Sequence, residues 1–112
     1  MKLWKIDDQI VISDKAQTVG KELTANTVDA AFEKHVPVIE QNGDTVTIRV
    51  GSVEHPSMPE HYIEWILLET EMGFQIHYLK PGNKPVATFK VNEKVIAAYE
   101  YCNLHGLWKA EI

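Results

Sequence analysis

The chain has 112 residues, the size of one domain, and its 45% apolar and 24% charged side chains are typical of a folded globular protein. Its 11 basic and 16 acidic side chains give a formal net charge of −5, which argues against binding to nucleic acid or to an anionic membrane. The apolar runs are too short for a transmembrane helix, and the first eight residues lack the apolar stretch of a signal peptide. A single cysteine excludes an intrachain disulfide, and we expect a cytoplasmic protein.

Residues 1–25 show little periodicity apart from a short apolar run at 9–12, and we expect them to form an amino-terminal extension of unclear role. From residue 26 onward, apolar and polar side chains alternate, and β-branched residues are frequent, as in half-buried strands. Clusters of turn-forming residues separate these segments. The expected strands are 36–40, 45–50, 62–70, 74–79, 86–91, 95–101 and 107–112, with a short helical turn within 27–34. This pattern predicts an all-β protein with a small antiparallel β-sandwich.

Four of the five histidines stand beside turn or loop residues: His35, His55, His61 and His105. The fifth, His77, lies within an expected strand. The only cysteine, Cys102, precedes His105 by three residues, so that a tight turn can bring a thiolate and an imidazole to one metal ion. Each of these residues alone is more often structural, and a lone buried cysteine is usually an inert apolar side chain. Their coincidence in the loops of so small a chain indicates a metal site.

The composition of this set narrows the choice of metal. A structural zinc site is tetrahedral and usually contains at least two cysteines, whereas this set has one. A blue-copper site usually adds a weak axial methionine near the cysteine, but no methionine follows Cys102. Five protein ligands leave one octahedral position open, and five-coordinate iron with an open face fits best.

Three segments carry a resemblance to a known family. They are EKHVP at 33–37, HPSMPEHYIEWI at 55–66 and CNLHGLW at 102–108. In this order they resemble superoxide reductase, the family of neelaredoxin and of the iron domain of desulfoferrodoxin. The resemblance extends from about residue 26 to the end of the chain, so we expect residues 26–112 to form the iron-binding domain. Desulfoferrodoxins also carry an amino-terminal rubredoxin-like iron domain with four cysteines, which this sequence does not have.

The resemblance implies an immunoglobulin-like β-sandwich, assembled as a dimer or higher homo-oligomer, with one non-haem iron per chain. It implies that Cys102 is the axial ligand and that four histidines are the equatorial ligands: His35, His55, His61 and His105. Glu33 resembles the carboxylate that can occupy the sixth position in the oxidised state, and Lys34 resembles the lysine beside the open face. His77 matches no ligand of the family, and we interpret it as structural.

The implied activity is the one-electron reduction of superoxide to hydrogen peroxide, with electrons from an external donor such as a rubredoxin-like protein. Lys34 would attract the anion, which matters because the net charge of the chain repels it. Lys84, in a turn distant in sequence, serves as the control for Lys34. The alternative is a binding or electron-transfer module with a degenerate metal site. A visible absorption band from ferric thiolate iron would distinguish the two.

Overall fold

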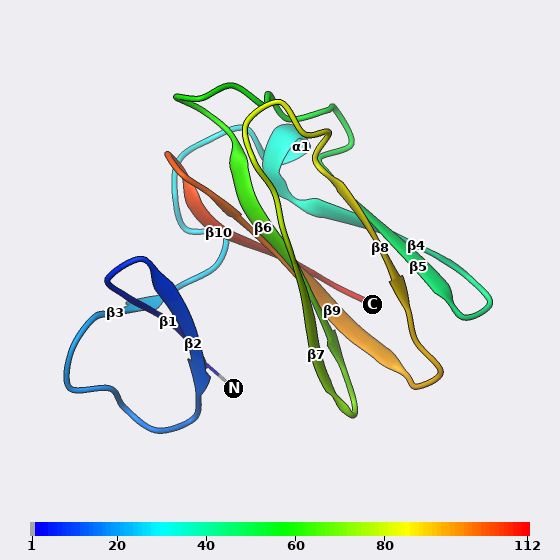
Figure 1. Ribbon diagram of the computed structural model, residues 1–112, viewed down its shortest axis with the longest axis horizontal. Coiled ribbons are helices and arrows are strands. Elements are labelled where there is room, and N and C mark those ends of the chain that lie inside the picture. The colour runs from blue at the N-terminus through cyan, green and yellow to red at the C-terminus, as the bar shows by residue number, and fades with distance from the viewer. Residues whose placement is uncertain (1) are drawn as a thin grey trace.

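Two antiparallel sheets form the body of the molecule in the computed structural model, which describes residues 2–112 (Figure 1). One sheet has the strand order β4–β5–β8, with β4 at Pro37–Asn42, β5 at Thr45–Val50 and β8 at Val86–Lys90. The other has the order β10–β9–β6–β7, with β6 at Ile63–Thr70, β7 at Gly73–Tyr78, β9 at Val95–Cys102 and β10 at Gly106–Glu111. The predicted antiparallel, immunoglobulin-like sandwich is confirmed.

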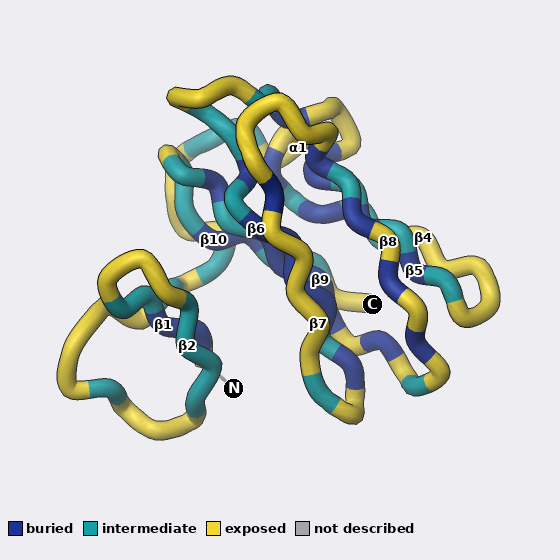
Figure 2. Tube along the Cα trace, in the orientation of Figure 1, coloured by how far each residue is buried: buried dark blue, intermediate teal, exposed yellow. Residues whose placement is uncertain are grey.

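The core lies between the facing surfaces of these sheets. Along β5, buried and partly exposed side chains alternate, because successive residues of a strand point to opposite faces. The buried members, Val46, Ile48 and Val50, pack with Ile66 and Leu68 of β6. Figure 2 shows the buried positions concentrated along the central strands β6 and β9. The apolar alternation read from the sequence therefore correctly identified the inward face.

Residues 2–23 form a third, smaller sheet of order β2–β1–β3, with β1 at Lys2–Ile6, β2 at Gln9–Ser13 and β3 at Lys21–Leu23. The sequence predicted only the second of these strands. In β1 the consecutive residues Leu3 and Trp4 are both buried, so the strand lacks the alternation by which strands are recognised. Leu3 packs against the outer face of the sandwich, in a cluster with Trp65 and Tyr99.

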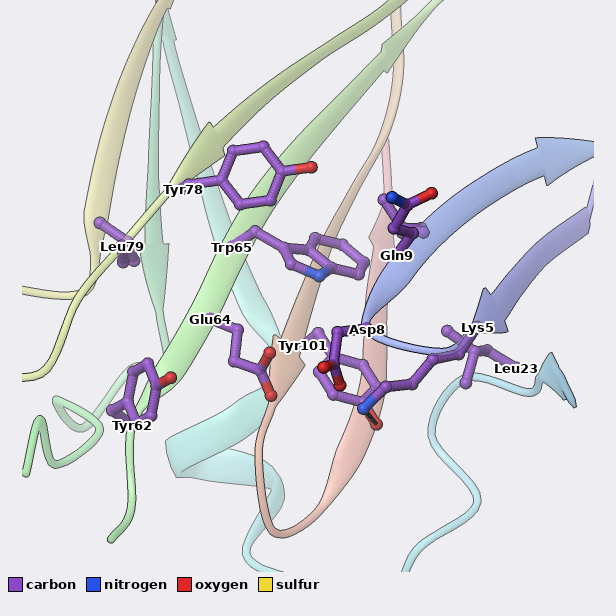
Figure 3. Close-up of a pocket in the computed structure, with 11 residues that line it drawn as sticks. Lys5, Asp8, Gln9, Leu23, Tyr62, Glu64, Trp65, Tyr78, Leu79 and Tyr101 are labelled. Carbon is purple, nitrogen blue, oxygen red and sulfur yellow. Dashed lines mark hydrogen bonds between the residues drawn. The ribbon is translucent and has the colours of Figure 1, made fainter. Parts of the chain in front are cut away.

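The seam between this sheet and the sandwich encloses a pocket of about 240 Å³ (Figure 3). Trp65 and Tyr101 stack along its wall, with their ring centroids 5.8 Å apart and their planes inclined by 16°. The Lys5 ammonium lies 4.9 Å from the centre of the Tyr101 ring, a distance at which a cation is attracted to the ring face. The amino-terminal sheet is thus attached to residues of β6 and β9 that point away from the core.

Asn26 joins the small sheet to the sandwich and covers the free edge of β10. Its backbone N–H donates to Leu107 O at 3.0 Å, and its side chain both accepts from Lys109 N at 2.8 Å and donates to Lys109 O at 3.1 Å. Asn26 has a φ of +59°, a conformation that asparagine tolerates better than most residues. This single residue therefore protects an edge that could otherwise pair with another chain.

The only helix among the described residues is α1, which spans Phe32–His35. It begins later than the helical turn expected within 27–34, and residues 28–30 form bends. A helix of four residues is far too short to cross a bilayer, and no membrane-spanning helix is found in residues 2–112.

Glu100 of β9 is fully buried, although glutamate is rarely buried without a partner. In the ladder it pairs with Ile66 of β6 and with Trp108 of β10, and neither carboxyl oxygen has a hydrogen-bond partner. It lies two residues before Cys102 and therefore on the same face of the strand. Burial raises the pKa of Glu100 well above its usual range, because the charged form loses its hydration. The fold therefore favours the neutral acid here.

Glu100→Gln is expected to stabilise the protein increasingly as pH rises. The folded chain holds the Glu100 proton above the pH at which the unfolded chain releases it, so wild-type stability falls as pH rises through that interval. The amide cannot ionise, and the gain over wild type should grow between pH 5 and pH 7 by up to about 1.4 kcal/mol per pH unit. Urea unfolding with a chelator present measures it.

Glu71→Gln controls for the loss of one negative charge, since Glu71 lies in the exposed turn between β6 and β7. A constant difference between Glu100→Gln and wild type across this pH range would contradict the assignment.

Candidate metal centre

All five predicted ligands meet at one end of the sandwich. His35 is the last residue of α1, His55 follows β5 in a loop, and His61 lies two residues before β6. Cys102 ends β9, and His105 lies in the turn before β10. In Figure 1 these segments gather around α1.

His77 lies apart from this group, as predicted. It is exposed on β7, opposite Ile66 of β6.

The four imidazole rings form a closed square. Neighbouring rings are 4.6 to 5.2 Å apart, in the order His35, His55, His61, His105 and back to His35. Each ring is inclined by 77° to 82° to its neighbours, whereas the opposite rings of His35 and His61 are 6.5 Å apart and only 31° from parallel. Four rings turned edge to face in this way can direct one nitrogen each toward a common centre.

The Cys102 thiol lies on the buried side of this square. Its Sγ is 3.5 Å from His55 Nε2 and 3.9 Å from His105 Nδ1, and the side chain is fully buried. Ligand atoms of Cys102, His35, His61 and His105 lie within 4.8 Å of one another, and His55 joins them through its contact with Sγ. His61 and His105 are partly exposed, whereas His35 and His55 are buried, so the square is most accessible to solvent at its His61 and His105 edge.

Backbone carbonyls set the orientation of two rings. Nδ1 of His35 donates to Ala31 O at 2.7 Å, and Nδ1 of His55 donates to Pro56 O at 2.7 Å. A neutral imidazole that donates through Nδ1 presents a lone pair at Nε2, which is the state a metal requires. His35 Nε2 lies 3.0 Å from His105 Nδ1, so both nitrogens face the same point.

Hydrogen bonds between loops hold the ligand segments in register. Asn103, between Cys102 and His105, accepts from Tyr62 N at 3.0 Å and donates to Glu60 O at 3.1 Å. It thereby joins the turn after β9 to the residues on both sides of His61. Trp108 Nε1 donates to His105 O at 3.1 Å. The sequence did not indicate these roles, because neither residue is a ligand and because the partners of Asn103 are distant along the chain.

The helix α1 is joined to the loop that carries His55. Val53 N donates to Glu33 O at 2.9 Å, and Gly51 N donates to Val36 O at 3.2 Å. Gly51 has a φ of +84°, and a Cβ there would lie 2.7 Å from Glu33 O, so only glycine fits. This close approach places His35 and His55 side by side.

Burial favours the neutral form of three of the histidines in the square. Desolvation is the main cause that lowers the pKa of His35 and His61, and it lowers the pKa of His55 to about 4. Burial also raises the pKa of the Cys102 thiol, against the effect of hydrogen bonds from the backbone of Leu104 and His105. A bound cation favours neutral imidazole and thiolate, so metal binding would displace the thiol proton.

Glu33 and Lys34 lie on α1, next to the ligands in sequence, and both are exposed. The Lys34 charge is among the causes that lower the pKa of His61, and the Glu33 charge opposes the lowering at His35. Both side chains therefore act electrostatically on the square. Their roles toward a bound group stay predictions.

The residues fit a metal ion. His61 Nε2 is buried and has no hydrogen-bond partner, which is costly unless a cation occupies the space in front of it. The donor set of imidazole nitrogens and one thiolate suits iron and other transition metals. It is consistent with the iron site of superoxide reductases.

Comparison with known proteins yields one family. The Desulfoferrodoxin family profile matches residues 27–111. A desulfoferrodoxin of Clostridium acetobutylicum is 52% identical over 99 residues, which cover 85% of this chain and 78% of that protein. A superoxide reductase of Pyrococcus abyssi is 36% identical, over 80% of this chain and 94% of its own length.

Solved structures extend the likeness. The superoxide reductase of Treponema pallidum, 38% identical, superposes with a TM-score of 0.89 over 99% of this chain and all of its own. Because the match covers 99% of this chain, the likeness extends into the amino-terminal sheet of residues 2–23, which carries no family motif. The superoxide reductase of Giardia intestinalis, 39% identical, has a TM-score of 0.62 over 71% of this chain and 97% of its own. By its fold, its site and these similarities, the chain belongs to the desulfoferrodoxin family.

Proposed function

We propose that this chain is a superoxide reductase, which reduces superoxide to hydrogen peroxide with one external electron and two protons. The observation that carries this proposal is the square of four imidazoles with a fully buried thiol against it and two of its rings partly exposed. We propose that one iron ion would be held by Cys102 and by four histidines: His35, His55, His61 and His105. Superoxide reductases of 36% to 39% identity support this assignment.

Iron in this site would supply the single electron, and a thiolate ligand favours release of peroxide over cleavage of the O–O bond. The protein contributes the electrostatics. Lys34 is an exposed ammonium whose charge reaches His61, and it would attract superoxide and stabilise negative charge on the bound anion. Glu33, beside it on α1, would supply a further carboxylate ligand in the oxidised state. Water near the exposed side of the square would supply the protons.

We further propose that residues 26–112 form the iron-binding domain and residues 1–25 an extension. The packing of Leu3 on the outer face of β6 and β9, away from the ligands, supports this division. The electron donor would be a rubredoxin-like protein that docks near the open side of the site. The single, free cysteine favours a cytoplasmic location.

Strand β7 supports a homo-oligomer, most simply a dimer. It is the second edge of its sheet, it contains no Asp, Glu, Lys or Arg, and every side chain from Phe74 to Tyr78 is exposed (Figure 2). Charged residues commonly protect such an edge from pairing. Antiparallel pairing of two copies about Ile76 would bring Phe74 of one copy opposite Tyr78 of the other, without any like charges.

The ligand assignment predicts a spectroscopic difference. Cys102→Ser should abolish the visible thiolate-to-iron band of the oxidised protein, because serine oxygen does not give this transition. His77→Gln, which removes an exposed histidine outside the square, should leave the band intact. Absorption spectra of iron-loaded, oxidised proteins test this. A band that persists in Cys102→Ser would exclude Cys102 as the ligand.

The reaction predicts a stoichiometry. With a reduced rubredoxin-like donor, each superoxide consumed should oxidise one donor equivalent, yield one hydrogen peroxide and release no oxygen. Without a donor, consumption should cease after one superoxide per iron, because the only cysteine is already a ligand and no second iron site of the rubredoxin type can form. Peroxide and oxygen electrodes measure both. Sustained donor-free turnover with release of oxygen would identify a dismutase instead.

The exposed edge predicts the assembly. At micromolar concentration, light scattering should give the mass of two chains for wild type and of one chain for Ile76→Lys, which places a charge in the pairing edge. Ile96→Lys is the matched control, since Ile96 is 39% exposed and Ile76 36%. A one-chain mass for wild type would reject the dimer, and a dimer that survives Ile76→Lys would place the interface elsewhere.

A further inference from the structure

A shallow depression of about 710 Å³ lies beside the ligand square. Three segments contribute to its lining: Lys34 comes from α1, His55 from the loop after β5, and Lys84 from the loop between β7 and β8. In Figure 1 the loop between β7 and β8 lies at the same end of the sandwich as α1. Lys84 therefore lies near Lys34 in the fold, although the two residues are distant in sequence. It is unsuitable as a control for Lys34.

The position of Lys84 is determined by its neighbours in the loop. Gly82 N lies 2.9 Å from Ser57 Oγ and 3.2 Å from Ser57 O, so it binds to the loop that carries His55. Pro85 is buried, and its carbonyl accepts from Val50 N at 3.0 Å. Lys84 is thus held between two anchored residues, while its own side chain remains 74% exposed.

The charges around the depression are unusual for this protein. The chain as a whole carries a net charge of −5 and repels anions, whereas two ammonium groups face this one region beside a ligand. Within residues 2–112, the one ion pair made by either lysine joins Lys84 Nζ to Glu54 Oε1 at 3.9 Å. Both groups are largely exposed, so the pair is weak and the ammonium stays available to an incoming anion.

We propose that Lys84 is a second steering residue, which acts together with Lys34 to attract superoxide to the site, and that Glu54 weakens this attraction. The inference rests on the proposed function, because it assigns the route of that substrate. Steering acts on the rate of encounter and is reduced by salt. Lys84 therefore need not contact the reacting atoms, and its effect should depend on charge alone.

The test uses variants of opposite sign on the iron-loaded full chain. By pulse radiolysis at low ionic strength, Lys84→Met should slow the second-order reaction with superoxide about twofold, and Glu54→Gln should accelerate it by a similar factor. Both differences should disappear as salt is added, because an exposed charge is screened. Lys84→Arg should retain the wild-type rate.

Lys94→Met is the matched control. Lys94 is an exposed lysine in the turn before β9, at the end of that strand opposite Cys102 and about 25 Å away at about 3.3 Å per residue. It should leave the rate and its salt dependence unchanged. A wild-type rate and salt dependence in Lys84→Met, or equal slowing in Lys94→Met, would overturn the proposal.

A binding measurement separates this inference from the proposed function. Thiocyanate, a small monovalent anion, should shift the amide resonances of Gly82 and Asn83 in the zinc-loaded full chain, and Lys84→Met should reduce these shifts whereas Lys94→Met should not. If wild type does not reduce superoxide but the shifts behave in this way, the function fails and the anion-attracting role of Lys84 stands. If superoxide is reduced but Lys84→Met leaves the shifts unaltered, the steering role fails.

Discussion

The register of β9 is the constraint on which the site depends. Cys102 ends this strand opposite Ile63 of β6 and Gly106 of β10, and its Sγ points into the sandwich because side chains alternate along a strand. A slip of one residue would turn the thiol to the outer face and Tyr101 inward. The pairing on both sides, and the apolar residues that the register buries, make such a slip costly. The four histidines are arranged around a sulfur atom whose place the sheet determines.

The square of imidazoles also explains why the site needs a cation. Four rings in contact, three of them with a lowered pKa, cannot accept protons without bringing like charges together in a desolvated space. Their lone pairs must face one another or an ion. Hydrogen bonds outside the square hold the ligands in place. The carbonyls of Ala31 and Pro56 orient the rings of His35 and His55, and the side-chain amide of Asn103 holds the segment that carries His61. The ring nitrogens are therefore directed toward the centre of the square before an ion binds.

Much of this arrangement could be predicted from the sequence, and the remainder could not for physical reasons. Alternation identified the strands of the sandwich, and the spacing of Cys102 and His105 indicated a shared ion. The strand at Lys2–Ile6 was not predicted, because its consecutive residues Leu3 and Trp4 are both buried and it therefore lacks the alternation of a half-buried strand. Lys84 was wrongly expected to lie far from Lys34. The two residues are distant in sequence, but the fold brings their segments together at one end of the sandwich. The role of Asn103 depends on partners some forty residues away.

The alternation of β9 separates two neighbouring residues into different environments. Tyr101 points outward to the amino-terminal sheet, and Cys102 points inward to the histidines. Whatever covers Trp65, Tyr99 and Tyr101 therefore contacts none of the five ligand side chains. During evolution, a different amino-terminal unit could therefore pack on this outer face without any change in the metal ligands. The requirement on such a replacement is to bury the same aromatic surface, while the ligands are inherited unchanged.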